Sequence, residues 1–343
     1  MRGLPKGPAL QRYDEGDTPR LAASLSVGRY SPAAVRSYKS IFGYFERWCQ
    51  SRGLNPLPTG LDVLSLYLCE LAPGYKLNTL KNVVSAVTFV NRMAGFDIDR
   101  KYLGPILRGI ARVHGAEMAK AVPLEIDELR ELVAHFPRSR RGLRDKAICL
   151  VAFAAALRAQ EIVRLDYRTP AGDALGRVLL DRRGATIEMH LPATAVALPS
   201  KVTKYVARGL DPCPVQAVED WVFDAGIKSG PLFRAIDKGG NVGEGRLLRN
   251  GLGIIIKRAI KEAAVNAGRS EADAARLAST CSPKSLRVGF IKSALEVGVS
   301  HERLALHMGW TTTQMVEAYK RRYQPLAANP LRKIFCIPPA DRS

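Results

Sequence analysis

The 343-residue chain lacks the signatures of several large protein classes. It has no Walker loop and no Rossmann glycine fingerprint, so nothing indicates ATP or NAD binding. It has no signal peptide and no run of about 18 apolar residues, so no membrane span is expected. We therefore expect a cytoplasmic protein whose reaction runs without a cofactor.

Cysteine is sparse and irregularly placed. The six cysteines form no C-x-x-C pair, and no histidine lies near them at metal-ligand spacing. Several lie in apolar runs such as residues 148–151, where a thiol behaves as a small hydrophobic group. The pattern is typical of a reduced cytosolic protein, and it gives no indication of a bound metal.

Acidic residues are few relative to basic ones. Lys and Arg number 52 against 32 Asp and Glu, which gives a formal net charge of +20 and a pI of about 10.0. The excess is spread over both halves of the chain and is not confined to a tail. Such a charge implies a polyanionic partner, most often a nucleic acid. The alternative is a soluble protein that is merely basic.

The first third of the chain predicts a small all-α domain at residues 24–115, after a mobile arm at residues 1–23. Four amphipathic helices are expected, from Ser31-Pro32, at 60–71, at 77–94 and at 101–114. Residues 116–122 read as a linker. The candidate DNA contacts are basic residues on these helices and in the linker: Arg36, Lys39, Lys76, Lys81, Arg108 and Lys120.

The remainder, residues 123–325, predicts a mixed domain. We expect a helix at 124–136, a basic loop at 137–144 and an apolar helix pair at 145–165. Between residues 176 and 210 the apolar period shifts toward two, which predicts a small antiparallel sheet. A helix at 248–267 follows, and then two short helices separated at Gly298.

Residues 284–319 carry the pattern that suggests chemistry. Lys284 and Arg287 are one helical turn apart, Gly309 precedes Trp310, and Tyr319 follows nine residues later in a strongly basic stretch. Each feature has an ordinary explanation: a solvated helix face, a turn before a core anchor, and a tyrosine with a packed ring. A tyrosine amid so much positive charge can also meet a phosphodiester.

The order and spacing of these residues resemble the tyrosine recombinases, the family of phage integrases, Xer proteins and Cre. The family's box His/Lys-x-x-Arg matches Lys284 and Arg287, although most members have histidine at the first position. Its arginine box Leu-Arg-x-x-Glu matches Arg158 and Glu161. The resemblance implies a catalytic lysine between two strands, for which Lys201 fits best and Lys204 is the alternative.

The resemblance also implies roles for these residues. Arg158, Arg287 and Lys284 would bind the scissile phosphate, Glu161 would support them, and Trp310 would donate its indole N–H. Tyr319 would be the nucleophile and Lys201 the general acid. His307 is a second candidate for a role at the site, with packing as the favoured explanation.

The expected fold is mainly α, with a four-helix SAM-like core-binding domain and an α+β catalytic domain. The expected function is site-specific recombination of double-stranded DNA at specific target sites, through a 3′-phosphotyrosyl intermediate. Members of the family act as homotetramers on DNA, in some cases with accessory DNA-bending proteins. The resemblance implies that the tail at residues 326–343 docks on a neighbouring subunit. The alternative is that this tail packs on its own subunit. The rival functions are a telomere resolvase, a type IB topoisomerase and a catalytically silent DNA-binding regulator.

Overall fold

A computed structural model describes residue 30 and residues 32–99, 101–115, 121–168, 176–180, 186–191, 202–209 and 211–324. The chain divides into two compact units, with the main boundary between residues 119 and 120, inside the stretch predicted as a linker. Each unit has its own hydrophobic core. The predicted arm, Lys120, Lys201 and the tail at 326–343 lie outside the described residues.

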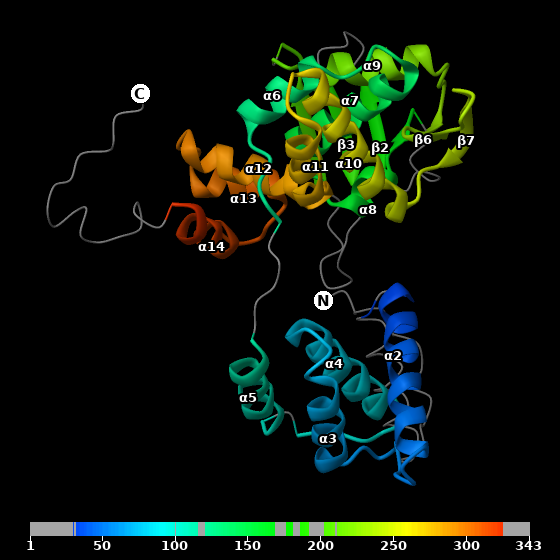
Figure 1. Cartoon of the computed structure of the whole chain (residues 1–343), viewed down its shortest axis with the longest axis vertical. Coiled ribbons are helices and arrows are strands. Elements are labelled where there is room, and N and C mark those ends of the chain that lie inside the picture. The colour runs from blue at the N-terminus through cyan, green and yellow to red at the C-terminus, as the bar shows by residue number, and fades with distance from the viewer. Residues whose placement is uncertain are drawn as a thin grey trace, which may run out of the picture. The chain divides into compact units, whose positions relative to one another are not determined.

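The N-terminal unit consists of four described helices (Figure 1). They are α2 (Pro32–Gln50), α3 (Leu61–Leu71), α4 (Leu77–Met93) and α5 (Leu103–His114). Their bounds follow the sequence-based expectation to within two residues. Apolar stripes from the helices meet in one core that includes Phe45, Leu64 and Leu80, each fully buried. The burial of these large side chains provides the main stabilisation of the unit.

The C-terminal unit is built from helices around a small sheet. Its helices are α6 (Ile126–Ala134), α7 (Arg140–Ala154), α8 (Ala159–Val163), α9 (Pro214–Asp224), α10 (Arg249–Asn266), α11 (Glu271–Thr280), α12 (Pro283–Glu296), α13 (His301–Met308) and α14 (Gln314–Tyr323). None of the described helices of either unit is long and apolar enough to cross a membrane.

The sheet has five strands in the order β4-β3-β2-β1-β5. They are β1 (Asp166–Tyr167), β2 (Arg177–Leu180), β3 (Thr186–Leu191), β4 (Val202–Ala207) and β5 (Gly230–Pro231). Strands β2, β3 and β4 are antiparallel, as expected, but β1 pairs with β2 in parallel. A second, two-stranded sheet of β6 (Arg234–Ile236) and β7 (Val242–Arg246) was not expected.

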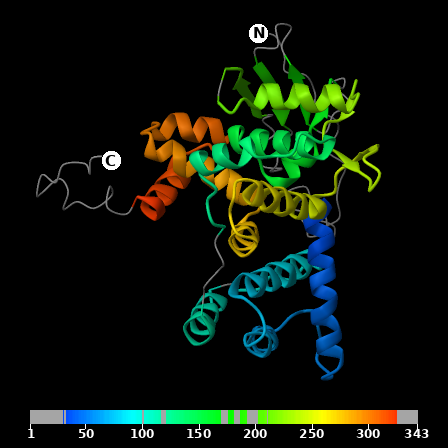
Figure 2. The ribbon, with the colours of Figure 1, turned by 45° about the horizontal axis from the view of Figure 1, so that its top comes forward.

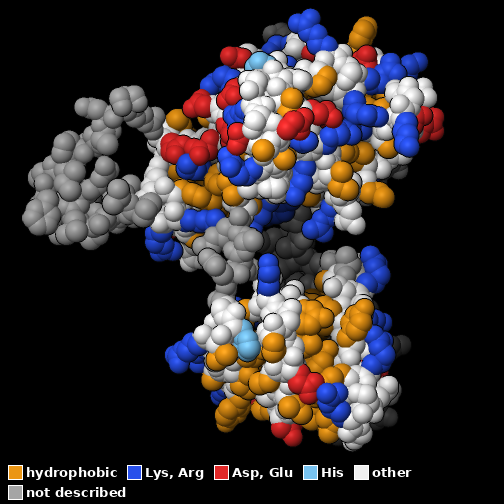
Figure 3. All heavy atoms as spheres, viewed as in Figure 1, with side chains coloured by type: hydrophobic (Ala, Val, Ile, Leu, Met, Phe, Trp, Pro, Cys, Tyr) orange, Lys and Arg blue, Asp and Glu red, His pale blue; other side chains and the backbone are white. Residues whose placement is uncertain are grey.

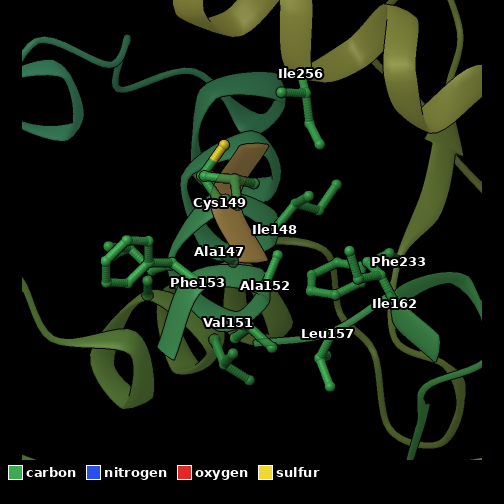
Figure 4. Packing of buried hydrophobic residues seen from close by; sticks show 14 of the residues in the cluster. Ala147, Ile148, Cys149, Val151, Ala152, Phe153, Leu157, Ile162, Phe233 and Ile256 are labelled. Atoms are coloured by element: carbon green, nitrogen blue, oxygen red, sulfur yellow. The ribbon is translucent and has the colours of Figure 1, made fainter. Parts of the chain in front are cut away.

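Helix α7 lies at the centre of the C-terminal unit. Figure 4 shows Ile148, Ala152 and Phe153 of this helix among side chains of neighbouring elements, including Ile162, Phe233 and Ile256. The alternating buried positions of β3, such as Ile187 and Met189, belong to the same core. The predicted fold class, mainly helical with a small sheet, is confirmed.

The basic stretch at 137–144, expected as a loop, is helical from Arg140 onward, and that part of the prediction was wrong. The hydroxyl oxygen of Ser139 accepts a hydrogen bond from the N–H of Gly142 at 3.2 Å and caps the helix. A Cβ on Gly142 would lie 1.9 Å from the carbonyl oxygen of Pro137, so only glycine fits there. The N-cap therefore stabilises the start of a helix here in spite of the repulsion among neighbouring basic residues.

Helices α12, α13 and α14 lie together at one side of the C-terminal unit in both views (Figures 1 and 2). The break between α12 and α13 falls at Gly298, as predicted from the sequence. Gly298 has a φ of 77°. Gly309, with a φ of 69°, ends α13 in the left-handed conformation that glycine adopts readily. These two turns return the chain so that Trp310 and Tyr319 pack against the small core formed with Ile291 and Leu304.

Candidate active site

One cavity of about 710 Å³ in the C-terminal unit gathers most of the sequence-predicted catalytic residues. Its lining side chains include Arg158, Lys284, Arg287, Trp310 and Tyr319. These residues come from the start of α8, from α12, from the turn after α13 and from α14. Segments more than 150 residues apart along the sequence therefore meet at one place.

Arg158 stands immediately before α8 and is held by Glu161. One carboxylate oxygen of Glu161 accepts from the backbone N–H of Arg158 at 2.7 Å, and the other accepts from its guanidinium at 2.7 Å. The side chain of Glu161 is 7% exposed, whereas that of Arg158 is 49% exposed. The buried carboxylate thus orients the arginine while leaving part of its guanidinium open to the cavity.

Helix α12 places Lys284 and Arg287 on the cavity. Its first turn is capped by Ser282, whose hydroxyl oxygen accepts from the N–H of Ser285, and Pro283 takes the first helical position. Gly289 packs so closely on the chain at Leu124 that a Cβ there would lie 1.7 Å from the Leu124 carbonyl oxygen. The position of α12 is therefore fixed by its N-cap and by the close contact of Gly289 with Leu124.

Lys284 and Arg287 have very different surroundings. Lys284 is exposed, but Arg287 is 8% exposed and donates a hydrogen bond to the carbonyl oxygen of Ala156. Burial, and then the nearby charge of Arg158, lower the pKa of Arg287 to about 10. At neutral pH Arg287 therefore keeps its positive charge.

Tyr319 lies in an aromatic stack. Its ring is 5.9 Å from that of Trp310 at 12°, and 6.1 Å from that of Tyr323 at 17°. The guanidinium carbon of Arg287 lies 6.0 Å from the Trp310 ring centroid. The stack therefore fixes the plane of the Tyr319 ring, and Arg287 of α12 lies over the Trp310 side of the stack.

Lys204, the alternative to Lys201, is buried and is not among the residues that line the cavity. Its ammonium donates to the carbonyl oxygens of Ala155 and His307, each at 2.7 Å. Burial, and then Arg287, lower its pKa to about 7. Lys201, immediately before β4, lies outside the described residues.

The ring of His307 is bound to the backbone and does not line the cavity that holds Tyr319. Its Nε2 donates to the carbonyl oxygen of Ala154 at 2.9 Å, because a carbonyl can only accept. The ring stacks on Phe290 with centroids 4.6 Å apart, and it lines a second cavity that does not include Tyr319. Burial, and then Lys204, lower its pKa to about 4, so the imidazole is neutral at neutral pH.

Comparison with known proteins assigns the chain to a family. The model of the phage integrase family matches residues 123–324, more than half of the chain. The chain belongs to the phage integrase family. It is a tyrosine recombinase, an enzyme that cleaves and rejoins DNA, as the sequence-based resemblance predicted.

One relative is similar to this chain in sequence, and two solved structures are similar to it in fold. An integrase/recombinase xerD homolog from Selenomonas ruminantium is 24% identical over 308 residues, which are 88% of this chain and 85% of the relative. The Tn1549 transposon integrase, solved with transposon right-end DNA, superposes with a TM-score of 0.58 at 16% identity, over 91% of this chain and all of the other. A lambda integrase dimer bound to a core site gives a TM-score of 0.51 at 12% identity, over 89% and 77% of the two chains.

The sequence analysis of this integrase missed two cavity residues, Arg249 and Asn250. They begin α10, and their side chains line the same cavity as Tyr319. The available signal was a polar pair directly after Leu247-Leu248, at the start of an apolar-periodic segment. By contrast, Arg258 of the same helix forms an ion pair at 2.6 Å with Asp145, whose side chain is buried.

The proposed DNA contacts of the N-terminal unit that the structure describes are Arg36, Lys39, Lys76, Lys81 and Arg108. All five are exposed. In the view of Figure 3, lysine and arginine side chains lie on the surface of both units. Their exposure leaves them able to contact phosphates, while the apolar faces of the same helices form the core.

Proposed function

We propose that Tyr319 is the nucleophile with which this integrase cleaves DNA at specific target sites. The observation that carries the proposal is the convergence of Tyr319, Arg158, Arg287 and Lys284 on one cavity. In the reaction, the phenol oxygen bonds to phosphorus and the bond from phosphorus to the 5′ oxygen breaks. The product is a 3′-phosphotyrosyl enzyme and a free 5′ hydroxyl.

The basic side chains supply the charge that this step needs. Arg158 and Arg287 each present a planar fork that can hold two phosphate oxygens and keep its charge at neutral pH. Lys284, which is exposed on the cavity, adds a third positive group. Trp310 can donate its indole N–H to an oxygen and cover one side of the phosphate. These charges favour the transition state, in which negative charge grows on the non-bridging oxygens.

Protons move at two points of the reaction. Tyr319 loses its phenol proton to solvent as it attacks, helped by the adjacent positive charge. Lys201 donates a proton to the leaving 5′ oxygen, in the role of general acid. The phosphotyrosyl bond retains the energy of the phosphodiester, so a 5′ hydroxyl of a second strand can displace the tyrosine and restore the DNA.

At the level of assembly, we propose that the enzyme acts as a homotetramer on double-stranded DNA. Residues 326–343 would dock on a neighbouring subunit, and accessory DNA-bending proteins would bind the same DNA. The enzyme would serve a mobile element and act in the cytoplasm. The exposed basic residues of the N-terminal unit would grip the backbone of each duplex, so binding would weaken steeply as salt rises. The net charge of +20 supports this part of the proposal.

The rival functions have less support. A silent DNA-binding regulator would have no need for the buried Glu161 that orients Arg158, or for a tyrosine that shares a cavity with Lys284 and Arg287. A telomere resolvase would share the Lys-x-x-Arg box. The family match and the Gly309-Trp310 pair favour a recombinase over both.

The test is covalent trapping on DNA from the flanks of the encoding gene, nicked so that religation is prevented. Wild type should form a protein–DNA adduct that survives denaturation, and Tyr319→Phe should form none while it still binds the DNA. The matched control is Tyr323→Phe: it stands in the same stack, and its buried hydroxyl has no hydrogen-bond partner among the described residues. An adduct in Tyr319→Phe would refute the assignment of the nucleophile.

A further inference from the structure

Three consecutive main-chain carbonyls at the C-terminal end of α7 bind side chains from three other elements. The carbonyl of Ala154 accepts from His307 of α13, that of Ala155 from Lys204 of β4, and that of Ala156 from Arg287 of α12. We call this arrangement the carbonyl clasp. It is made by groups that the proposed reaction leaves unused, apart from Arg287.

Helix chemistry explains why donors gather at this point. The last carbonyls of a helix have no partner within the helix, and they carry the negative end of its dipole. Ala155 and Ala156 are fully buried, so water cannot satisfy them. Ala156 also has a φ of 48°, a left-handed conformation that is unfavourable for a residue with a Cβ. The hydrogen bond from Arg287 offsets part of that cost.

Lys204 joins two of these elements directly. Besides the Ala155 carbonyl, its ammonium binds the carbonyl oxygen of His307, so a single side chain of β4 bridges the end of α7 and helix α13. His307 adds a second link through its ring, which also stacks on Phe290 of α12. Trp310 stands only three residues after His307, just beyond the end of α13.

We propose that Lys204 and His307 are positioning residues that fasten α13 to the end of α7, and thereby place Trp310 and the Tyr319 stack over Arg287. The inference rests on the proposed function of Tyr319 and Arg287. Lys204 is distinct from the proton donor, because its ammonium is turned to two carbonyls, is 5% exposed and does not line the cavity. The charged and titratable groups around it are Arg287, Glu161, Arg158 and His307.

The deciding experiment uses a bridging 5′-phosphorothiolate at the cleavage position, after that position has been mapped with wild type. A thiolate leaves without a proton, because the pKa of a thiol is near 8.5, so this substrate does not need a general acid. Lys201→Ala should cleave ordinary DNA slowly and recover on the sulfur substrate. Lys204→Met should lose about a hundredfold in adduct formation on both substrates, the loss expected when reacting groups shift by about 1 Å.

The alternative outcomes are distinct. Recovery of Lys204→Met on the sulfur substrate would make Lys204 the proton donor, and an unchanged rate on ordinary DNA would deny it any role; either result overturns the proposal. Absence of any adduct with wild type on both substrates would instead defeat the proposed function itself.

A second pair of variants guards against loss of folding in Lys204→Met. His307→Gln keeps an N–H donor for the Ala154 carbonyl, and His307→Leu removes it at similar volume. We expect His307→Gln to cleave within about threefold of wild type, and His307→Leu to be slowed at least tenfold with unchanged DNA binding. Equal rates in the two variants would overturn the role of His307.

Discussion

Two groups of basic side chains meet at the end of α7 and differ in what they bind. Arg158 and Lys284 face the cavity and keep much of their surface exposed. Lys204 is buried and bound to backbone carbonyls, and its pKa is lowered to about 7. Arg287 belongs to both groups, since it lines the cavity and binds the Ala156 carbonyl. A lysine close to an active site can therefore serve either the substrate or the protein, and burial decides which.

The largest effect should come from the residue that the two groups share. Arg287→Ala should slow adduct formation about a thousandfold, because it removes a preorganised charge from the phosphate. It should also lower stability, since the Ala156 carbonyl loses its donor. Single-turnover trapping and thermal unfolding measure the two effects. Arg276→Ala is the control, since that side chain is 80% exposed; a similar loss there would show that the effect is not local.

The next effect should appear on the buried side of α12. Gly289→Ala should destabilise the protein by about 3 kcal/mol, because the new Cβ would overlap the Leu124 carbonyl oxygen and force α12 to move. Gly251→Ala in α10 has no atom within 4 Å of the added Cβ and should gain about 0.5–1 kcal/mol. Denaturant unfolding compares the two. Equal stability of the two variants would contradict the tight packing of α12.

On the cavity side, the effect should be confined to catalysis. Lys284→Ala should slow adduct formation about tenfold, because one positive group near the phosphate is lost. Its stability should stay within about 0.5 kcal/mol of wild type, since Lys284 is exposed. A large fall in melting temperature would place Lys284 in the buried group instead.

The last prediction concerns the pH dependence of stability. The pKa of His307 is lowered to about 4 in the folded protein, against about 6.5 when unfolded. Between these values the unfolded chain binds more protons, so the contribution of His307 is complete above about pH 6.5 and is lost as the pH falls toward 4. His307→Gln should lack this loss. The stability difference between wild type and His307→Gln should therefore change across that window, and a constant difference would exclude a buried neutral imidazole.

Most of the fold could be predicted because its signals are local. The apolar period gave helix bounds such as those of α4, and Gly298 marked the break before α13. The two-stranded sheet of β6 and β7 escaped prediction, since only Ile236 and Val242 of its strands are apolar and partly buried. Helix α11 was missed although Ser270 and Asp273 form a cap that the sequence displays.

The site divides in the same way. Arg158, Lys284, Arg287, Trp310 and Tyr319 were predicted through the resemblance to the tyrosine recombinases, and the structure brings all five to one cavity. The roles of Lys204 and His307 could not be predicted, because their partners are the main-chain carbonyls of Ala154, Ala155 and His307, which the sequence does not distinguish from any others. The presence of Arg249 and Asn250 at the cavity could not be predicted either, because it depends on where the fold places the start of α10.

The carbonyl clasp also bears on the order of synthesis and folding. Its hydrogen bonds join residues 49, 131 and 153 positions apart, and the most distant partner, His307, stands just before Trp310 and Tyr319. Contacts this far apart in the chain form late, after the intervening segments have closed their loops. A chain released from the ribosome only as far as residue 300 therefore has Arg158 and Arg287, but it lacks His307, which completes the clasp, and Tyr319. Under the proposed mechanism, the protein can break DNA only after synthesis has passed residue 319, so shorter nascent chains cannot cleave it.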